Sequence, residues 1–167
     1  LPKSRAIRKC ATGSAPAAIT IPISESVCFS DAVTYVTTNY PFDPAIIAMG
    51  YMDNCTTIDA TSISLISPAA GSGVDCNWDV TYVYNVTDDC GNVLGSESWV
   101  ISGSDTEAPT GTAPSGTTGI ASCLSGASAA APAFNATTVA TAYSDDCSTV
   151  NITNMSSSTS GTNCSWT

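Results

Sequence analysis

Apolar residues recur at every second position in several short stretches of this chain, and turn-forming residues separate these stretches. The clearest case is 77–86, where Trp78, Val80, Tyr82, Tyr84 and Val86 alternate with mainly polar positions. This alternation predicts a half-buried β-strand with the five side chains on one face. The sequence DDCGN then supplies turn residues, and 93–103 returns as a further strand.

Four further stretches are rich in strand-forming residues and lie between clusters of Gly, Pro and Ser. The predicted strands span 17–23, 31–38, 45–51 and 56–66. No stretch shows the period of three to four residues that is typical of an amphipathic helix. The pattern therefore predicts an all-β chain whose short strands form β-sandwiches.

The chain also contains an internal repeat. The sequences GSAP (13–16) and GTAP (111–114) precede two copies of a common set of landmarks. The landmarks, separated by 95, 92 and 88 positions, are VC at Cys28 and SC at Cys123, DNC ending at Cys55 and DDC ending at Cys147, and CNW at Cys76 and CSW at Cys164. The shrinking separation is what loop deletions would produce, and the repeat predicts tandem modules.

The repeat divides the chain into four expected parts. These are a basic arm (1–10), a complete module (11–104), a polar linker (105–110) and an incomplete module (111–167) that lacks the last two strands and their turn. In one interpretation the sequence is a segment of a longer tandem array. In the other, the second module accepts a strand from within residues 1–23 of a neighbouring copy, and such head-to-tail contacts would form a fibre.

Charge narrows the range of partners. The 167 residues carry a net charge of -10, and the four basic residues, Lys3, Arg5, Arg8 and Lys9, all lie near the amino terminus. Nucleic acids and anionic membranes attract basic surfaces, so neither is an expected partner. No apolar run approaches the roughly 18–20 residues of a membrane span. The basic arm is a solvated tail, an arm that docks on an acidic neighbouring copy, or a protease site.

Catalysis has little support in the sequence. The chain has no His, and its lysines lie only near the amino terminus, so its Ser and Thr residues lack a recognisable base. A carboxylate pair could hydrolyse glycosides, but most of the 14 acids lie in turn contexts. We expect no enzyme and no required cofactor. Asp105, Glu107, Asp145 and Asp146 are candidate calcium ligands, the alternative being solvated turn acids.

Six of the nine Asn residues begin the sequence N-x-S/T. Asn85, Asn135, Asn151 and Asn154 are candidate N-glycosylation sites, and surface glycan would make the chain a glycoprotein. Asn54 and Asn163 also begin such sequences but are less suitable because each adjoins a cysteine. The alternative is that these sequences arise from a composition rich in Ser and Thr.

Eight cysteines occur without a C-x-x-C pair. In a chain without His, this favours disulfides over a zinc site and indicates an oxidising, extracellular setting.

Three of these motifs together carry a family resemblance: DNC before an alternating strand, DVTYVYNVTDDCGN (79–92) and WVISGSDTEAP (99–109). They resemble the hyalin-repeat (HYR-like) immunoglobulin-type module, in the four-cysteine form found in long, repetitive bacterial surface proteins. The resemblance covers about 19–109 and 111–167, although the second copy lacks D-x-C-G-N. It implies tandem immunoglobulin-like sandwiches and an extracellular adhesive or structural spacer without catalytic residues.

A sandwich of this kind suggests a disulfide pattern. Its strands would place Cys28 and Cys76 at one end, and Cys55 and Cys90 at the other. A Cys76–Cys90 bridge is disfavoured, because about 11 strand residues at ~3.3 Å each would separate the two by roughly 35 Å, against the ~5.5 Å that a bridge needs. The expected bridges are Cys28–Cys76, Cys55–Cys90 and, by equivalence of the copies, Cys123–Cys164. Cys10 and Cys147 are then unpaired or available for an intermolecular bridge.

The expected function is structural. The chain is predicted to be a subunit or fragment of a disulfide-stabilised extracellular filament or adhesin stalk, with copies of itself or neighbouring repeats as partners. The alternative is a carbohydrate- or partner-binding surface module that uses exposed aromatic side chains. Tyr35, Tyr40, Tyr51 and Trp99 are the candidates, although aromatic residues on alternating strands are more often core or cross-strand pairs.

Overall fold

The computed structural model describes residues 11–163 and 165–167, so the basic arm, Cys10 and Cys164 lie outside the described residues. The chain divides into two compact units, with the boundary between Thr106 and Glu107. We call the part before this boundary unit 1 and the part after it unit 2. The boundary falls within the stretch 105–110, where the sequence predicts a linker.

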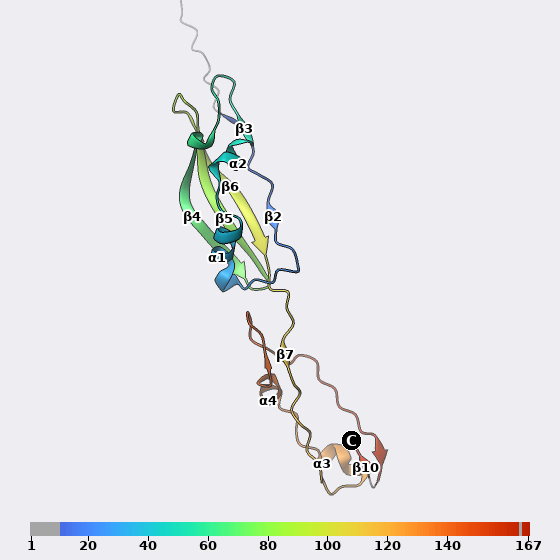
Figure 1. Ribbon diagram of the computed structural model, residues 1–167. Helices are drawn as coiled ribbons and strands as arrows, with labels where there is room; N and C mark the ends of the chain where they lie inside the picture. The colour runs from blue at the N-terminus through green and yellow to red at the C-terminus, as the bar shows by residue number, and fades with distance from the viewer. Residues whose placement is uncertain (1–10, 164) are drawn as a thin grey trace, which may run out of the picture. The chain divides into compact units, whose positions relative to one another are not determined.

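Unit 1 is built on a four-stranded sheet with the order β2-β6-β5-β4 (Figure 1). The long strands β4 (Ile63–Val74), β5 (Asn77–Thr87) and β6 (Val93–Gly103) pair as an antiparallel meander, and the short β2 (Ile19–Thr20) pairs in parallel with β6. The bounds of β5 and β6 confirm the strands predicted at 77–86 and 93–103. A separate two-stranded ladder joins β1 (Thr12–Gly13) to β3 (Tyr51–Met52).

One face of β5 forms the centre of the core of unit 1. The side chains of Trp78, Val80, Tyr82, Tyr84 and Val86 are each at most 3% exposed, which confirms the predicted alternation. The intervening side chains on the opposite face, from Asp79 to Thr87, are half-buried. Burial of each large apolar side chain contributes roughly 1.5–3 kcal/mol, so this one strand provides much of the driving force for folding.

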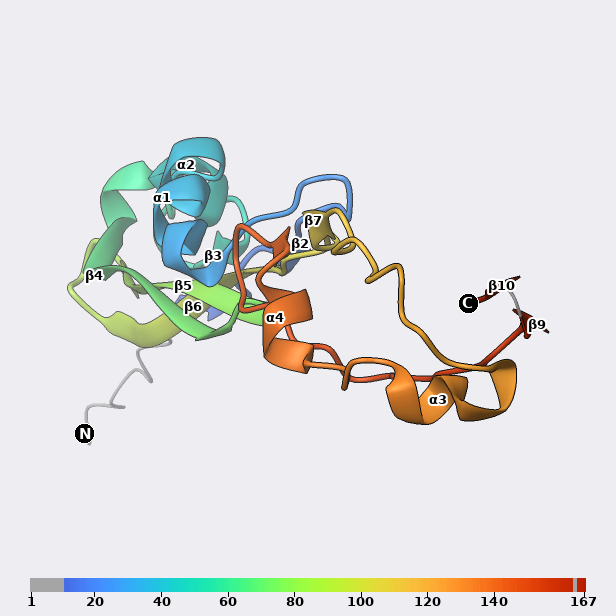
Figure 2. The same cartoon turned by 90° about the horizontal axis from the view of Figure 1, so that it is seen from below.

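Two helices cover this face of the sheet. The helix α1 (Phe29–Asn39) packs on β4 and β5, and α2 (Pro44–Ala48) packs near the start of β4. Figure 2 shows both helices on the same side of the sheet. The prediction of strands at 31–38 and 45–51 is therefore wrong, as is the prediction that no stretch is helical.

The residues of α1 carry a helical period that strand propensity conceals. Phe29, Ala32, Val36 and Tyr40 follow one another at spacings of three or four, Val33 lies four positions after Phe29, and all five belong to the core or pack against it. Val and Thr favour strands because of their branched β-carbons. That preference is weak, and the packing of an apolar stripe onto the sheet outweighs it.

The start of α2 follows common capping rules. The carboxylate of Asp43 accepts a hydrogen bond from the backbone N–H of Ala45 at 2.8 Å, and Pro44 occupies the first turn. An Asp cap with Pro directly behind it is typical of a helix start. We expected these residues only to interrupt two strands.

The remaining strand predictions for unit 1 are correct only in part. Between 17 and 23 only β2 is a strand, and between 56 and 66 a 3-10 turn, η1 (Ala60–Ser62), precedes β4. Unit 1 therefore consists of a four-stranded sheet with a helical second layer and the small β1-β3 ladder. The described chain is β-rich with few helices, and the predicted sandwich is not confirmed.

Unit 2 contains shorter elements than unit 1. Among its described residues, Ala127 is the only hydrophobic side chain that is fully buried. β7 pairs with β8 and β9 pairs with β10, both in antiparallel fashion. The bounds are β7 (Thr110–Gly111), η2 (Leu124–Gly126), α3 (Ala127–Ala130), α4 (Ala136–Ala140), β8 (Tyr143–Ser144), β9 (Gly161–Thr162) and β10 (Ser165–Trp166).

Among the described residues of both units, no helix has the length and apolar character needed to cross a membrane.

Candidate interaction site

Both units contain the same tryptophan anchor. In unit 1 the indole N–H of Trp78 donates a hydrogen bond to the carbonyl oxygen of Val27 at 2.8 Å. In unit 2 the indole N–H of Trp166 donates to the carbonyl oxygen of Ser122 at 2.9 Å. Val27 and Ser122 directly precede the first cysteine landmark of each copy, so the sequence repeat corresponds to a repeated contact in the fold.

A glycine–tyrosine pair also recurs. Gly13 pairs with Tyr51 between β1 and β3, and Gly111 pairs with Tyr143 between β7 and β8. A β-carbon on Gly13 would overlap the carbonyl oxygen of Gly50, and one on Gly111 would overlap that of Ala142. The Gly of GSAP and GTAP is therefore required by a close backbone approach.

The corner that leads into the tryptophan strand is the same in the two units. Gly73 has φ +121° and pairs with Trp78, and Gly161 has φ +120° and pairs with Trp166. Both glycines occupy a backbone region that other residues rarely adopt. The pairs Thr162–Ser165 and Gly161–Trp166 thus repeat the pairs Val74–Asn77 and Gly73–Trp78 at the start of the turn between β4 and β5.

Two equivalent aspartates organise the loops that contain DNC and DDC. Asp53 accepts hydrogen bonds from the backbone N–H groups of Cys55 and Thr56, at 2.7 and 3.1 Å. Asp145 accepts from those of Cys147 and Ser148, at 3.1 and 2.7 Å. Ser148 donates to Asp145 through both its backbone N–H and its hydroxyl. These two hydrogen bonds are the main reason why the pKa of Asp145 is lowered. Aspartates in this position form Asx turns.

The turn that follows β5 is held by a third aspartate. Asp88 accepts hydrogen bonds from the side-chain amide of Asn92 at 2.6 Å and from the backbone N–H groups of Asn92 and Cys90 at 2.8 and 2.9 Å. The Asn92 side chain is the largest cause of the lowered pKa of Asp88. Gly91 has φ +79°, so the DDCGN sequence meets its turn requirement as predicted.

In unit 1, Tyr51 is enclosed by residues of β5 and β6. Its hydroxyl lies 3.0 Å from the Tyr84 hydroxyl and donates to the Glu97 carboxylate at 2.9 Å. The Tyr84 ring meets the Tyr51 ring edge-on, with centroids 6.3 Å apart. Burial and these two hydrogen bonds raise the pKa of Tyr51 well above its usual range. This network could not be predicted from the sequence, because nothing in the linear pattern links Tyr51 to Glu97.

Unit 2 contains a cleft next to Tyr143, the counterpart of Tyr51. It has a volume of about 460 Å³ and is lined by residues of α4, by Tyr143 and by residues 149–152. Tyr143 is half-buried, and among the described residues its hydroxyl has no hydrogen-bond partner. Tyr143 lies 92 positions after Tyr51, the same separation as Cys147 from Cys55. An alignment of the two copies at this separation would have identified Tyr143 from the sequence as the counterpart of Tyr51.

The cysteines do not form the expected bridges. Cys55, Cys76, Cys90 and Cys123 are free and exposed, so neither Cys28–Cys76 nor Cys55–Cys90 is formed. Cys28 and Cys147 are each disulfide-bonded, which corrects the expectation that Cys147 is unpaired. Cys123 carries a free thiol, and its expected partner, Cys164, lies outside the described residues.

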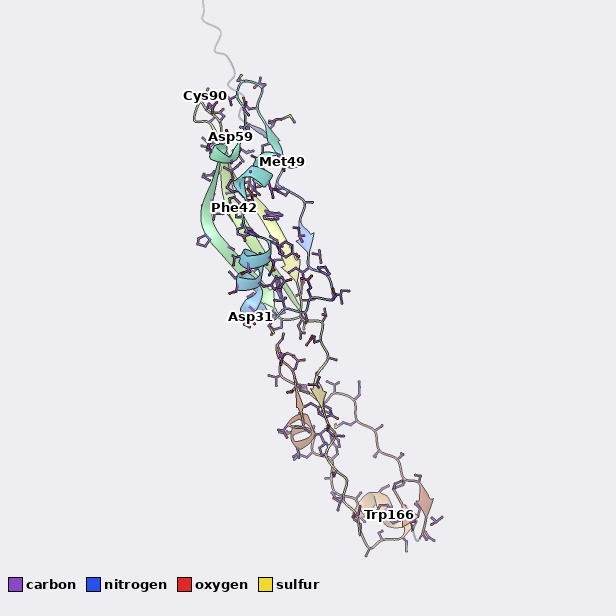
Figure 3. The ribbon with its side chains drawn as sticks, viewed as in Figure 1. Asp31, Phe42, Met49, Asp59, Cys90 and Trp166 are labelled. Atoms are coloured by element: carbon purple, nitrogen blue, oxygen red, sulfur yellow. The ribbon has the colours of Figure 1, made fainter. Side chains whose placement is uncertain are left out.

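The segments that contain Cys28 and Cys76 nevertheless lie together at one end of unit 1, as the sequence predicts. The backbone N–H of Phe29 donates to the Asp75 carboxylate at 2.8 Å, so the residues next to Cys28 and Cys76 meet. In Figure 3, Cys90 lies with Asp59 at one end of the unit and Asp31 lies at the other. The bridges were wrong because nearness of two segments does not ensure that two thiols face each other at bonding distance.

The candidate calcium ligands are divided between the two units. Asp105, in unit 1, accepts a hydrogen bond from the Ser26 hydroxyl at 2.9 Å. Glu107, Asp145 and Asp146 belong to unit 2, where Asp145 holds its own turn. In the part of the chain that the structure describes, no three acidic, His or Cys side chains are grouped so that they could hold a metal ion.

Most of the candidate glycosylation sites are accessible. Asn135, Asn151 and Asn154 are exposed, whereas Asn85 is half-buried on β5 and accepts a hydrogen bond from the Ser96 N–H at 3.2 Å. Asn135 is the N-cap of α4, where its side chain accepts from Thr138 at 3.1 Å. Asn151 lines the cleft of unit 2, so a glycan on this residue would obstruct it. Asn54 and Asn163 are also exposed.

The aromatic residues considered for carbohydrate binding are largely inside unit 1. Tyr51 is 6% and Trp99 is 8% exposed, and the Trp99 ring stacks on Tyr82 with centroids 5.7 Å apart. Tyr35 and Tyr40 are half-buried. The burial of Tyr51 and Trp99 therefore removes two of the four side chains from which an aromatic binding surface would be built.

No protein-family model matches this chain, and comparisons with curated proteins and with solved structures found no significant match.

Proposed function

We propose that this chain is part of an extracellular structural protein, a filament or adhesin stalk built from tandem copies of one module. The observation that carries the proposal is the recurrence, in units 1 and 2, of the same tryptophan anchor, glycine–tyrosine pair and Asx turn. Repeated modules with the same internal contacts are the usual way to build an extended structural protein.

Chemical features of the chain support this setting. Cys28 and Cys147 are disulfide-bonded, and such bonds persist mainly outside the cytosol. The acidic surface, with all basic residues in the first nine positions, suits a protein whose copies stay dispersed until a specific contact forms. The DDCGN and DTEAP motifs add the hyalin-repeat resemblance, which implies the same role and no catalytic activity.

Head-to-tail assembly is the finer form of the proposal. Residues 12–13 and 19–20 are already paired inside unit 1, and Ile21 is 5% exposed. A segment from 1–23 therefore cannot be donated as a whole without unfolding unit 1. The part available for donation is the basic arm, residues 1–10, which would be drawn electrostatically to the acidic unit 2 of the next copy.

Electron microscopy of the oxidised, purified chain tests this form of assembly. We compare the full chain, a variant that lacks residues 1–10 and a variant with those ten residues in scrambled order. Fibres that form with the native arm and not in the other two support donation of the arm. Monomers in all three samples contradict donation, and fully reduced cysteines in protein recovered from its source would contradict the extracellular setting.

A further inference from the structure

Two cysteine positions of the repeat are disulfide-bonded in one unit and free in the other. We call the cysteine of VC and SC the first landmark, and that of DNC and DDC the second. The first landmark is bonded in unit 1, as Cys28, and is free and exposed in unit 2, as Cys123. The second is free and exposed in unit 1, as Cys55, and is bonded in unit 2, as Cys147. One cysteine of each kind therefore keeps its thiol.

The first landmark has the same backbone in both units. Cys28 is the N-cap of α1 with φ -66° and ψ 150°, and Cys123 is the N-cap of η2 with φ -75° and ψ 158°. The carbonyl oxygen of Cys28 accepts a hydrogen bond from the Asp31 N–H at 3.0 Å, and that of Cys123 accepts from the Gly126 N–H at 2.9 Å. Neither cysteine side chain caps its helix. The backbone of Cys123 is thus as well suited to a bridge as that of Cys28.

The second landmark also has the same setting in both units. The N–H of Cys55 donates to the Asp53 carboxylate at 2.7 Å, and the N–H of Cys147 donates to the Asp145 carboxylate at 3.1 Å. Cys147 is half-buried, whereas Cys55 is exposed. Because the local structure is alike, the difference in bonding depends on which sulfur lies opposite.

We infer that Cys123 of one chain forms a disulfide with Cys55 of a second copy of the chain. Among the described residues the two bonded cysteines are one of each kind, which favours a bridge between unlike landmarks over one between like landmarks. Such a contact is heterologous, so it leaves one thiol of each kind at the ends of the product and can repeat. The inference rests on the proposed extracellular structural role and supplies its covalent link.

The other free cysteines do not support the same inference. Cys76 and Cys90 are both exposed. The counterpart of Cys76 is Cys164, which lies outside the described residues, and Cys90 stands in a DDCGN sequence that does not recur within 111–167. Neither position has a bonded counterpart in the part of the chain that the structure describes. Both cysteines therefore serve as controls.

The bridge forms by two thiol–disulfide exchanges with a disulfide oxidant, for which the test uses oxidised glutathione. The Cys123 thiolate attacks one glutathione sulfur, forms a mixed disulfide and releases the first glutathione. The Cys55 thiolate of the second copy attacks the Cys123 sulfur of this mixed disulfide and releases the second glutathione. One protein disulfide replaces two S–H bonds, and two electrons and two protons pass to the two glutathione molecules.

The first experiment oxidises the full chain carrying Cys76→Ser and Cys90→Ser with a stoichiometric amount of oxidised glutathione. Non-reducing electrophoresis should show a ladder at multiples of the chain mass that collapses on reduction, and peptide mapping should find the Cys55–Cys123 bridge. Both thiols should react with iodoacetamide in the monomer and be protected in the ladder. The chain with Cys76 and Cys90 restored should give the same bridge. Bridges from Cys55 or Cys123 to any other cysteine would overturn the inference.

The second experiment separates the possible pairings. In this background, Cys55→Ser keeps only the thiol of Cys123, and Cys123→Ser keeps only that of Cys55, of the two that the inference needs. Each variant alone should stay monomeric, and an equal mixture should give dimers and nothing longer. Dimers of either variant alone would show a bridge between like positions. A Cys55–Cys123 bridge confined to monomers would show pairing within one chain, and either result would overturn the inference.

Failure of this inference differs from failure of the proposed function. Fibres seen by electron microscopy in the oxidised chain without a Cys55–Cys123 bridge would refute the inference and leave the structural role in place. Formation of the bridge in the test, together with fully reduced cysteines in protein recovered from its source, would instead support the pairing and contradict the extracellular setting.

Discussion

The indole N–H of Trp78 donates to the carbonyl oxygen of Val27 over 2.8 Å and so joins the start of β5 to the residue before the N-cap of α1. Trp166 and Ser122 repeat this relationship at 2.9 Å in unit 2. The two bonds differ in their surroundings, because Trp78 is 1% exposed and Trp166 is half-buried. They form a natural matched pair for measuring what the anchor contributes.

Trp78→Phe should lower the free energy of unfolding of unit 1 by about 2–4 kcal/mol, because it leaves the Val27 carbonyl without its donor and opens a cavity in the core. Urea denaturation, with hydrogen exchange of the β5 amides, measures the loss. Trp166→Phe is the control and should cost less than about 1 kcal/mol, because its ring is partly solvated. Similar losses in both variants would show that burial does not determine the strength of the anchor.

Gly103→Ala should destabilise unit 1 by about 1–3 kcal/mol, because the added β-carbon would overlap the six-membered ring of Trp78. Thermal unfolding followed by near-ultraviolet circular dichroism reports the change around the tryptophan. Gly116→Ala is the matched variant, since nothing lies within 4 Å of its added β-carbon. A neutral Gly103→Ala would mean that the Trp78 ring can shift at little cost.

Asp88 should contribute to stability at neutral pH and lose that contribution in acid. Its pKa is lowered by the Asn92 and Cys90 hydrogen bonds, so its contribution is complete above the unfolded value of about 4 and disappears as the pH falls through the lower folded value. Asp88→Asn should therefore reduce the difference in thermal midpoint between pH 7 and pH 2.

The neighbouring Asp89→Asn is the control for this measurement. It removes the same charge from an exposed side chain without removing the turn hydrogen bonds. An identical flattening of the pH profile by both substitutions would assign the effect to net charge and not to the Asp88 turn.

Thiol reactivity should separate two classes of cysteine. In the native, non-reduced protein, Cys55, Cys76, Cys90 and Cys123 should react with iodoacetamide, whereas Cys28 and Cys147 should react only after reduction. Peptide mapping by mass spectrometry identifies the modified residues. Recovery of peptides bridged as Cys28–Cys76 and Cys55–Cys90 would instead support the pairing implied by the hyalin-repeat resemblance.

Local propensity wrongly predicted a strand in the segment that forms α1, whereas the alternation of apolar residues correctly predicted the strand β5. In β5 the strand-forming residues and the two-residue period agree, so a single interpretation remains. In α1 they disagree: Val33, Tyr35 and Val36 favour a strand, but the spacing of the buried residues is helical. The sheet next to it decides the conflict, and only the folded chain contains that information.

The strand β4 and the cysteines illustrate a second limit. Residues 67–74 are mostly small or turn-forming, and they are extended because β5 supplies their hydrogen-bond partners. Likewise, cysteine spacing indicates oxidation but not pairing, because a bridge needs two particular side chains at the right distance and angle.

The sequence by itself determined the repeat, the inward face of β5, the β6 strand and the DDCGN turn, because each depends on contacts between residues that are close in the chain or on copies that can be compared directly. Only the tertiary structure decided that the second layer of unit 1 is helical, that Tyr51 meets Tyr84 and Glu97, and that Tyr143 lines an open cleft. These features depend on which distant segments share a surface, and burial against that surface is a larger free-energy term than any local preference.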